Sequence, residues 1–88
     1  MNGEKLIRNK DSISRKIENE ILVFNQISKQ YYILNETAAL VWELSDGQHT
    51  IDEIVRGVMD ECVDAEAEIV RKDVIETVNG MRKLKILS

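Results

Sequence analysis

The sequence contains no proline, one cysteine and one histidine, and each scarcity removes a class of protein. The lone cysteine, Cys62, excludes an internal disulfide, and with the lone histidine, His49, it is too little for a typical zinc site. No apolar run approaches the roughly 18 residues of a membrane span, and the N-terminus lacks the apolar core of a signal peptide. We therefore expect a cytoplasmic protein without a membrane partner.

Basic residues are also scarce in the second half of the chain, where acidic ones outnumber them. The net charge is −4, but residues 1–33 hold six Lys and Arg against four Asp and Glu, whereas residues 34–88 hold six against twelve. Nucleic-acid phosphates are bound by Lys and Arg, and an acidic surface opposes a polyanion. This balance disfavours a nucleic-acid partner.

The first half is typical of short strands. Apolar, largely uncharged runs at 13–17, 21–25 and 30–34 are separated by tight polar connections, which predicts a three-stranded antiparallel meander. Residues 1–11 are charged and aperiodic, and we expect them to form a flexible tail. The remaining 77 residues or so, 12–88, are enough for a single domain.

The second half begins with a helix that we expect over residues 36–46. Asn35 precedes it and can accept a hydrogen bond from a free N–H of the first turn. Gly47 follows it and can take the left-handed conformation that closes many helices. The "DG" pair therefore predicts a sharp turn after this helix.

Two further helices follow this turn. The letters "TIDE" predict a capping box, in which Thr50 and Glu53 satisfy each other's backbone N–H groups, and a helix from there to about Glu61. A third helix is expected from a cap at Asp64 to about Lys85. Strands followed by helices predict an α+β fold in which the helices cover one face of the sheet.

The chain offers little material for catalysis. His49 lies in a predicted turn. Cys62 is surrounded by acidic residues, whereas a reactive thiolate needs neighbouring cations or a helix N-terminus. The carboxylates between Asp60 and Glu68 lack the spacing of a calcium loop. We expect no enzyme activity, no cofactor and no metal.

The two edges of the predicted sheet differ in charge. The strand at 13–17 carries Arg15 and Lys16, which discourage pairing with another chain, whereas the strand at 30–34 has no charged residue. An uncharged edge is suited to bind an extended peptide as an added strand. The alternatives are that the third helix or the N-terminal tail covers it, or that the order of the strands is different. Leu34 should face the core together with Tyr32, which leaves Tyr31 and Ile33 on the opposite face.

The stretch "LNETAALVWEL", followed by "DG", "TIDEIV", "RKDV" and "LKIL", resembles the PqqD-like family, also called RiPP recognition elements. The resemblance covers about residues 12–88. It implies a winged-helix-like fold of a three-stranded meander followed by three α-helices. It also implies a non-catalytic adaptor that binds the leader segment of a ribosomally made precursor peptide. The partner enzyme would be a radical SAM enzyme or a leader peptidase with a cyclase, as in PQQ or lasso-peptide biosynthesis.

The resemblance also implies where the peptide binds, namely along the third strand and against the third helix. Val74 and Val78 can serve either this groove or the core. A winged-helix DNA-binding regulator and a self-associating module stay open as alternatives. The matching positions are Gln30, Tyr31, Tyr32, Ile33 and Leu34 on the strand, and Val70, Asp73, Val74, Thr77, Val78 and Met81 on the helix.

Overall fold

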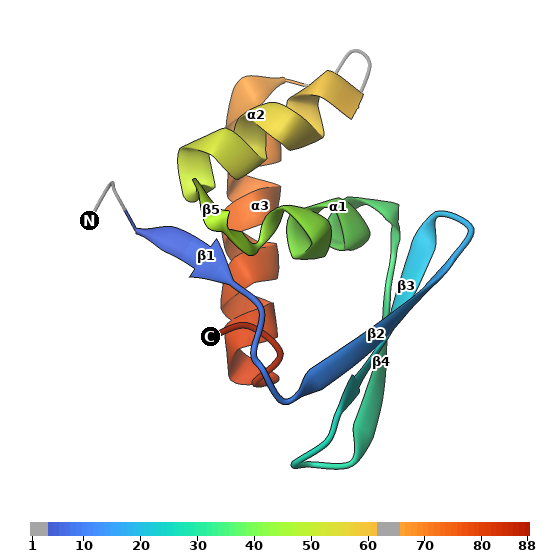
Figure 1. Cartoon of the computed structure of the whole chain (residues 1–88). Helices are drawn as coiled ribbons and strands as arrows, with labels where there is room; N and C mark the ends of the chain where they lie inside the picture. Colours follow the sequence, from blue (N-terminus) through green and yellow to red (C-terminus); the bar gives the residue numbers. More distant parts are fainter. Residues whose placement is uncertain (1–3, 62–65) are drawn as a thin grey trace.

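The computed structural model describes residues 4–61 and 66–88, which form the predicted α+β fold of a three-stranded meander and three helices, with two strands, at residues 5–7 and 46–50, that were not predicted (Figure 1). No helix within these two ranges is long and apolar enough to cross a membrane. In chain order the elements are β1 Lys5–Ile7, β2 Ser12–Ile17, β3 Glu20–Asn25, β4 Gln30–Leu34, α1 Glu36–Leu44, β5 Asp46–Thr50, α2 Ile51–Glu61 and α3 Ala67–Lys83.

Strands β2, β3 and β4 form the predicted antiparallel meander, with β3 in the centre. Ile17 pairs with Glu20, so residues 18 and 19 alone make the first turn, and Glu18 takes the positive φ of 56° that short hairpin turns favour. The second turn covers residues 26–29. The prediction that the 30–34 strand lies at an edge is confirmed.

Asn25 at the end of β3 fastens this sheet to the end of α3. Its side-chain oxygen accepts hydrogen bonds from the N–H groups of Ile27 and Ser28, at 2.9 and 3.2 Å. Its amide nitrogen donates to the carbonyl oxygens of Leu84 and Lys85, at 3.4 and 3.3 Å. Asn25 is only 2% exposed, so these bonds satisfy a buried polar group that would otherwise destabilise the fold.

The first two helices begin at the predicted caps, whereas α3 begins at Ala67, after Glu66. The side-chain oxygen of Asn35 accepts a hydrogen bond of 2.9 Å from the N–H of Ala38. The N–H of Thr50 donates to Glu53 Oε1 at 2.8 Å, and the N–H of Glu53 donates to Thr50 Oγ1 at 3.3 Å, which confirms the capping box. The predicted cap at Asp64 lies outside the described residues.

The first helix ends earlier than expected, at Leu44 instead of residue 46. Ser45 ends it, because its hydroxyl donates to the carbonyl oxygen of Val41 at 2.7 Å. Gly47 has a φ of +85°, so its predicted left-handed conformation is confirmed. Its role differs from the expected one, since it lies within β5 at an irregular step in the pairing with β1.

The expectation of a flexible tail over residues 1–11 is wrong for the described part of that segment. Strand β1 pairs with β5, and Leu6 is only 1% exposed. The next residues pair with the C-terminal segment: the N–H of Asn9 donates to Ile86 O at 2.9 Å, and the N–H of Ser88 donates to Ile7 O at 3.0 Å. This segment therefore closes the core beside α3.

The core lies around α1, which contacts the sheet on one side and the other two helices on the other (Figure 1). Trp42 of α1 is 2% exposed, and the guanidinium of Arg8 lies 5.8 Å from its ring centroid, within the range of a cation–π contact. The buried apolar residues are Leu6, Ile21, Val23, Leu34, Ala39, Val41, Trp42, Ile54, Val55, Val58, Val70, Val74, Val78, Met81, Ile86 and Leu87.

Candidate functional site

The outer edge of β4 is unpaired among the described residues, because β3 is the strand on its inner side and none follows on its outer side. Neither the N-terminal segment nor α3 covers this edge with backbone hydrogen bonds in the described ranges. The edge is also uncharged, in keeping with the sequence "QYYIL". An uncharged free edge is the geometry that accepts an added strand.

The register identifies the peptide groups that point outward. The short turn makes Ile17 and Glu20 a hydrogen-bonded pair, and bonded pairs alternate along antiparallel strands. In β3, Glu20 and every second residue after it therefore form backbone hydrogen bonds with β2. Ile21 and every second residue after it form backbone hydrogen bonds with β4. The β4 partners of that second set are Leu34, Tyr32 and Gln30. We infer that the N–H and C=O groups of Tyr31 and Ile33 point away from the sheet.

The side chains of β4 divide between two faces as predicted. Leu34 is 6% exposed and Tyr32 packs against the core, whereas Tyr31 and Ile33 are 66% and 72% exposed. On the exposed face, the rings of Phe24 and Tyr31 lie 4.6 Å apart across the strands. This cross-strand contact fixes the side chain of Tyr31 next to the free edge.

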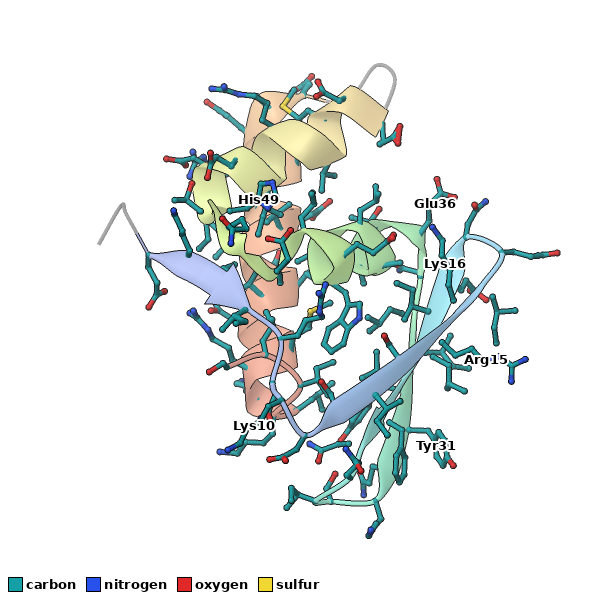
Figure 2. The ribbon with its side chains drawn as sticks, in the orientation of Figure 1. Lys10, Arg15, Lys16, Tyr31, Glu36 and His49 are labelled. Atoms are coloured by element: carbon teal, nitrogen blue, oxygen red, sulfur yellow. The ribbon has the colours of Figure 1, made fainter. Side chains whose placement is uncertain are left out.

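The opposite edge of the sheet, β2, carries charge. Arg15 and Lys16 are both exposed, and Figure 2 shows Arg15 and Tyr31 pointing away from the helices, whereas Lys16 points towards α1. Lys16 Nζ lies 3.5 Å from Glu43 Oε1. Two cations in neighbouring positions oppose strand addition at β2, so the sheet has one edge suited to a peptide.

The apolar residues predicted on α3 belong to the core. Val70, Val74, Val78 and Met81 are each at most 6% exposed and pack in the main cluster. They cannot contact a bound peptide without a rearrangement of the core. Among the α3 residues named from the sequence, Asp73 is exposed and Thr77 half-buried.

Ion pairs distinguish the two flanks of α3. Arg71 pairs with Asp52 of α2, and Arg82 donates to Glu4 beside β1 at 2.9 Å. Figure 1 shows β1 on one side of α3 and β4 on the other, so the flank that contacts Glu4 lies on the side away from β4.

At 100° per residue, the other flank carries Asp73, Thr77 and Gly80. This flank ends at Leu84. The side-chain amide of Asn25 donates a hydrogen bond to the carbonyl oxygen of Leu84, near the start of β4. A side chain added at Gly80 would meet nothing within 4 Å, so this flank is open. The β4 edge and this polar flank of α3 are therefore the parts of the predicted site that are accessible in the described residues. Gly80 is not among the positions expected from the sequence, although its spacing from Asp73 and Thr77 places it on the same side of the helix.

The shifted pKa values lie away from this edge, at β5. His49 Nδ1 is 2.9 Å from Asp46 Oδ1 and 3.1 Å from Leu44 O. The hydrogen bond with Asp46 raises the pKa of His49, and the same bond lowers the pKa of Asp46. The backbone N–H of Thr50 lowers the pKa of Glu53. These contacts are local to the turn between α1 and α2, and they stabilise it.

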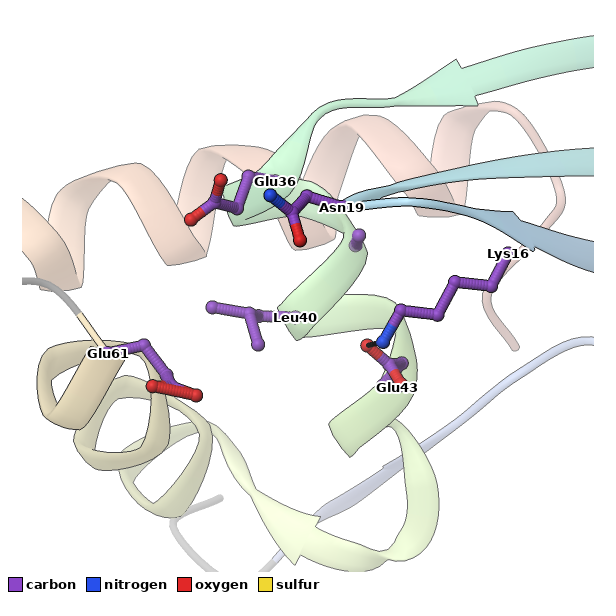
Figure 3. A pocket seen from close by; sticks show the side chains of 7 residues that line it. Lys16, Asn19, Glu36, Leu40, Glu43 and Glu61 are labelled. Atoms are coloured by element: carbon purple, nitrogen blue, oxygen red, sulfur yellow. Dashed lines mark hydrogen bonds and ion pairs between the residues drawn. The ribbon is translucent and has the colours of Figure 1, made fainter.

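Acidic side chains also line a hollow of about 180 Å³ between α1, α2 and the β2–β3 turn. Figure 3 shows Glu36, Glu43 and Glu61 around it, with Lys16 paired to Glu43. This surface belongs to α1 and α2, the two helices that would form a helix-turn-helix pair in a DNA-binding regulator. Its charge repels phosphate, which disfavours the DNA-binding alternative.

The fold and its free edge define a small winged-helix-like α+β domain. A family model described as "Coenzyme PQQ synthesis protein D (PqqD)" matches residues 20–87, and the chain belongs to this family. The family resemblance drawn from the sequence is confirmed. A comparison with curated proteins finds no match.

Two solved structures share the fold at low sequence identity. One, described as "TbiB1 in Complex with the TbiA(beta) Leader Peptide", has a TM-score of 0.85 and 17% identity, and the match covers 93% of this chain and 94% of that one. The other, "Lasso peptide synthetase B1 complexed with the leader peptide", has a TM-score of 0.83 and 15% identity, and the match covers 96% and 98%. Nearly the whole chain is thus similar in fold to these proteins.

Proposed function

We propose that this chain is a non-catalytic cytoplasmic adaptor that binds the leader segment of a ribosomally made precursor peptide. The leader adds to β4 as a fourth strand and is presented to an enzyme that modifies the peptide. The free, uncharged edge of β4 is the observation that carries this proposal. Membership in the PqqD family supports it, as do both similar structures, which are described as complexes with leader peptides.

Backbone pairing supplies only part of the binding free energy. Tyr31 and Ile33 offer four outward groups, and a hydrogen bond contributes roughly 0.5–1.5 kcal/mol net, which gives about 2–6 kcal/mol. Loss of translational and rotational freedom costs about 4–15 kcal/mol. Side-chain contacts must therefore provide most of the affinity and all of the selectivity.

The flank of α3 forms the second wall of the site, and the side chains of the bound leader contact it. Asp73 favours a basic or hydrogen-bond-donating residue of the leader, and Thr77 offers a hydroxyl. Gly80 leaves space for a bulky residue at the end of the flank. The valines of α3 support this wall from the core side and do not touch the peptide.

The test is a calorimetric titration with the leader of the precursor encoded beside this chain. Ile33→Pro removes one outward N–H and none of the bonds to β3, so binding should fall at least tenfold while the domain stays folded. Tyr32→Pro removes a bond to β3 and should destabilise the fold.

Ser14→Pro is the matched control. The same alternation points the N–H of Ser14 outward, but from the charged edge at β2, so the leader should bind this variant as it binds the natural chain. Equal losses in Ile33→Pro and Ser14→Pro would contradict strand addition at β4.

A further inference from the structure

The sheet has an exposed apolar face that the peptide edge does not account for. It is the face turned away from the helices, and Figure 2 shows its labelled members Arg15 and Tyr31 pointing into open space. Ile13 and Ile17 on β2 are 53% and 52% exposed, and Tyr31 and Ile33 on β4 are 66% and 72% exposed. A contiguous apolar surface of this kind marks an interaction site.

The cross-strand register shows that these side chains form one surface. Ile13 pairs with Phe24, which in turn pairs with Tyr31, so one apolar row crosses all three strands. Ile17, at the other end of β2, and Ile33 line a hollow of about 120 Å³ together with Leu22 and Glu20. Its volume is comparable to the roughly 150 Å³ of an enclosed cavity that holds a benzene-sized group, although this hollow is open to solvent.

One cation, Arg15, lies between these two apolar ends, and one anion, Glu20, lies at the Ile17 end of the same face. Arg15 pairs with Leu22 across the strands and shares their face, and it makes no ion pair or side-chain hydrogen bond within residues 4–61 and 66–88. A partner that covers this face must place a carboxylate opposite Arg15, since an unpaired buried charge strongly weakens binding.

We propose that this face, defined by Ile13, Arg15, Ile17, Leu22, Tyr31 and Ile33, docks the enzyme that modifies the bound peptide. The enzyme presents an apolar patch with one carboxylate facing Arg15 and one side chain in the hollow. This proposal rests on the proposed function for the identity of the partner. Since β4 belongs to both surfaces, an enzyme docked here lies beside the added strand.

The charge argues against a second copy of the chain as the occupant. Two copies packed with a twofold axis at the centre of this face, beside Arg15, would bring two Arg15 side chains together in one apolar interface, with the two Glu20 side chains away from the axis. Like charges in such a place cost several kcal/mol. The natural chain should therefore remain monomeric, and Arg15 is the residue that keeps it so.

The first experiment measures self-association by analytical ultracentrifugation over increasing concentrations. The natural chain should sediment as a monomer, and Arg15→Leu should associate as its concentration rises. Arg56→Leu is the control, because it removes an exposed cation from α2, and it should stay monomeric. A natural chain that dimerises through this face would overturn the proposal in favour of a second copy.

The second experiment measures binding of the modifying enzyme encoded beside this chain to the immobilised full chain. Arg15→Glu and the double variant Ile13→Thr with Ile17→Thr should each weaken binding about tenfold or more, as expected at the centre of an interface. Arg56→Glu and Ile75→Thr change an exposed cation and an exposed apolar residue on the helices, and should change binding less than about twofold. Equal affinities for all variants would overturn the proposal.

A titration with the leader peptide separates the two proposals. The face variants should bind the leader as the natural chain does, because none of them alters β4 or α3. A natural chain that binds the enzyme but not the leader would refute the proposed function and leave the docking face supported. A chain that binds the leader but shows no variant-sensitive docking would refute the docking face alone.

Discussion

Replacing Gly47 by valine tests the connection between α1 and α2, on which the placement of β1 and β5 depends. Gly47 has a φ of +85°, and a side chain at this position would lie 3.3 Å from Ile7 Cδ1. The conformation costs a β-branched residue about 1–2 kcal/mol. Ile7 is 51% exposed, so it can move aside, and the contact adds little. We therefore expect a loss of about 1–2 kcal/mol in the free energy of unfolding.

Thermal unfolding followed by circular dichroism measures this loss. For a domain of this size, 1 kcal/mol corresponds to roughly 4–8 °C in Tm, so Gly47→Val should lower Tm by about 4–16 °C. Gly80→Ala is the matched control, because an added methyl group there meets nothing within 4 Å and lies in a helix. It should raise stability by about 0.5–1 kcal/mol. An unchanged midpoint in Gly47→Val would show that the turn does not require the left-handed conformation.

Three further predictions follow from local charge. The pKa of His49 is raised, so its bond to Asp46 stabilises the fold fully below the ordinary value of 6.5, and this contribution is lost as the pH rises through the higher folded-state pKa. The pKa of Asp46 is lowered, so its contribution is present above 3.8 and is lost as the pH falls through the folded-state pKa. Tm should thus decline more between pH 5.5 and 8 in the natural chain than in His49→Gln, and parallel declines would refute this assignment. Asp73→Lys should weaken a leader with a basic residue opposite it by about two- to fivefold in calorimetry, as expected for an exposed ion pair, whereas Glu76→Lys on the outer side of α3 should not. Duplex DNA should show no sequence-dependent mobility shift at physiological salt, and a nanomolar, sequence-dependent shift would restore the DNA-binding alternative.

The meander and the caps could be predicted because their signals are local. Apolar runs with short turns specify β2 to β4, and the pairs of Thr50 with Glu53 and of Asn35 with Ala38 lie within one helical turn. The strands β1 and β5 could not be predicted in the same way. Their pairing joins Lys5 to Thr50, far apart in sequence, and β5 reads "DGQHT", which has neither apolar alternation nor β-branched residues before its end.

The exposed side chains of β4 could be predicted from the sequence, whereas the exposed side chains of α3 could be predicted less well. Alternation along β4 fixes which side chains face outward, because the strand has a single buried face. On α3, Val74 and Val78 have the same spacing whether they face the core or a groove, and only their burial in three dimensions decides. The residues that remain accessible, Asp73 and Thr77, lie one position before Val74 and Val78 along the helix.

The most direct measurement of the central claim is an NMR titration of the labelled chain with the leader of the neighbouring precursor. Strand addition predicts that the amide signals of Tyr31 and Ile33 shift most and gain protection from hydrogen exchange, together with shifts at Asp73 and Thr77. Shifts confined to α2 and residues 46–50, with β4 silent, would contradict the account.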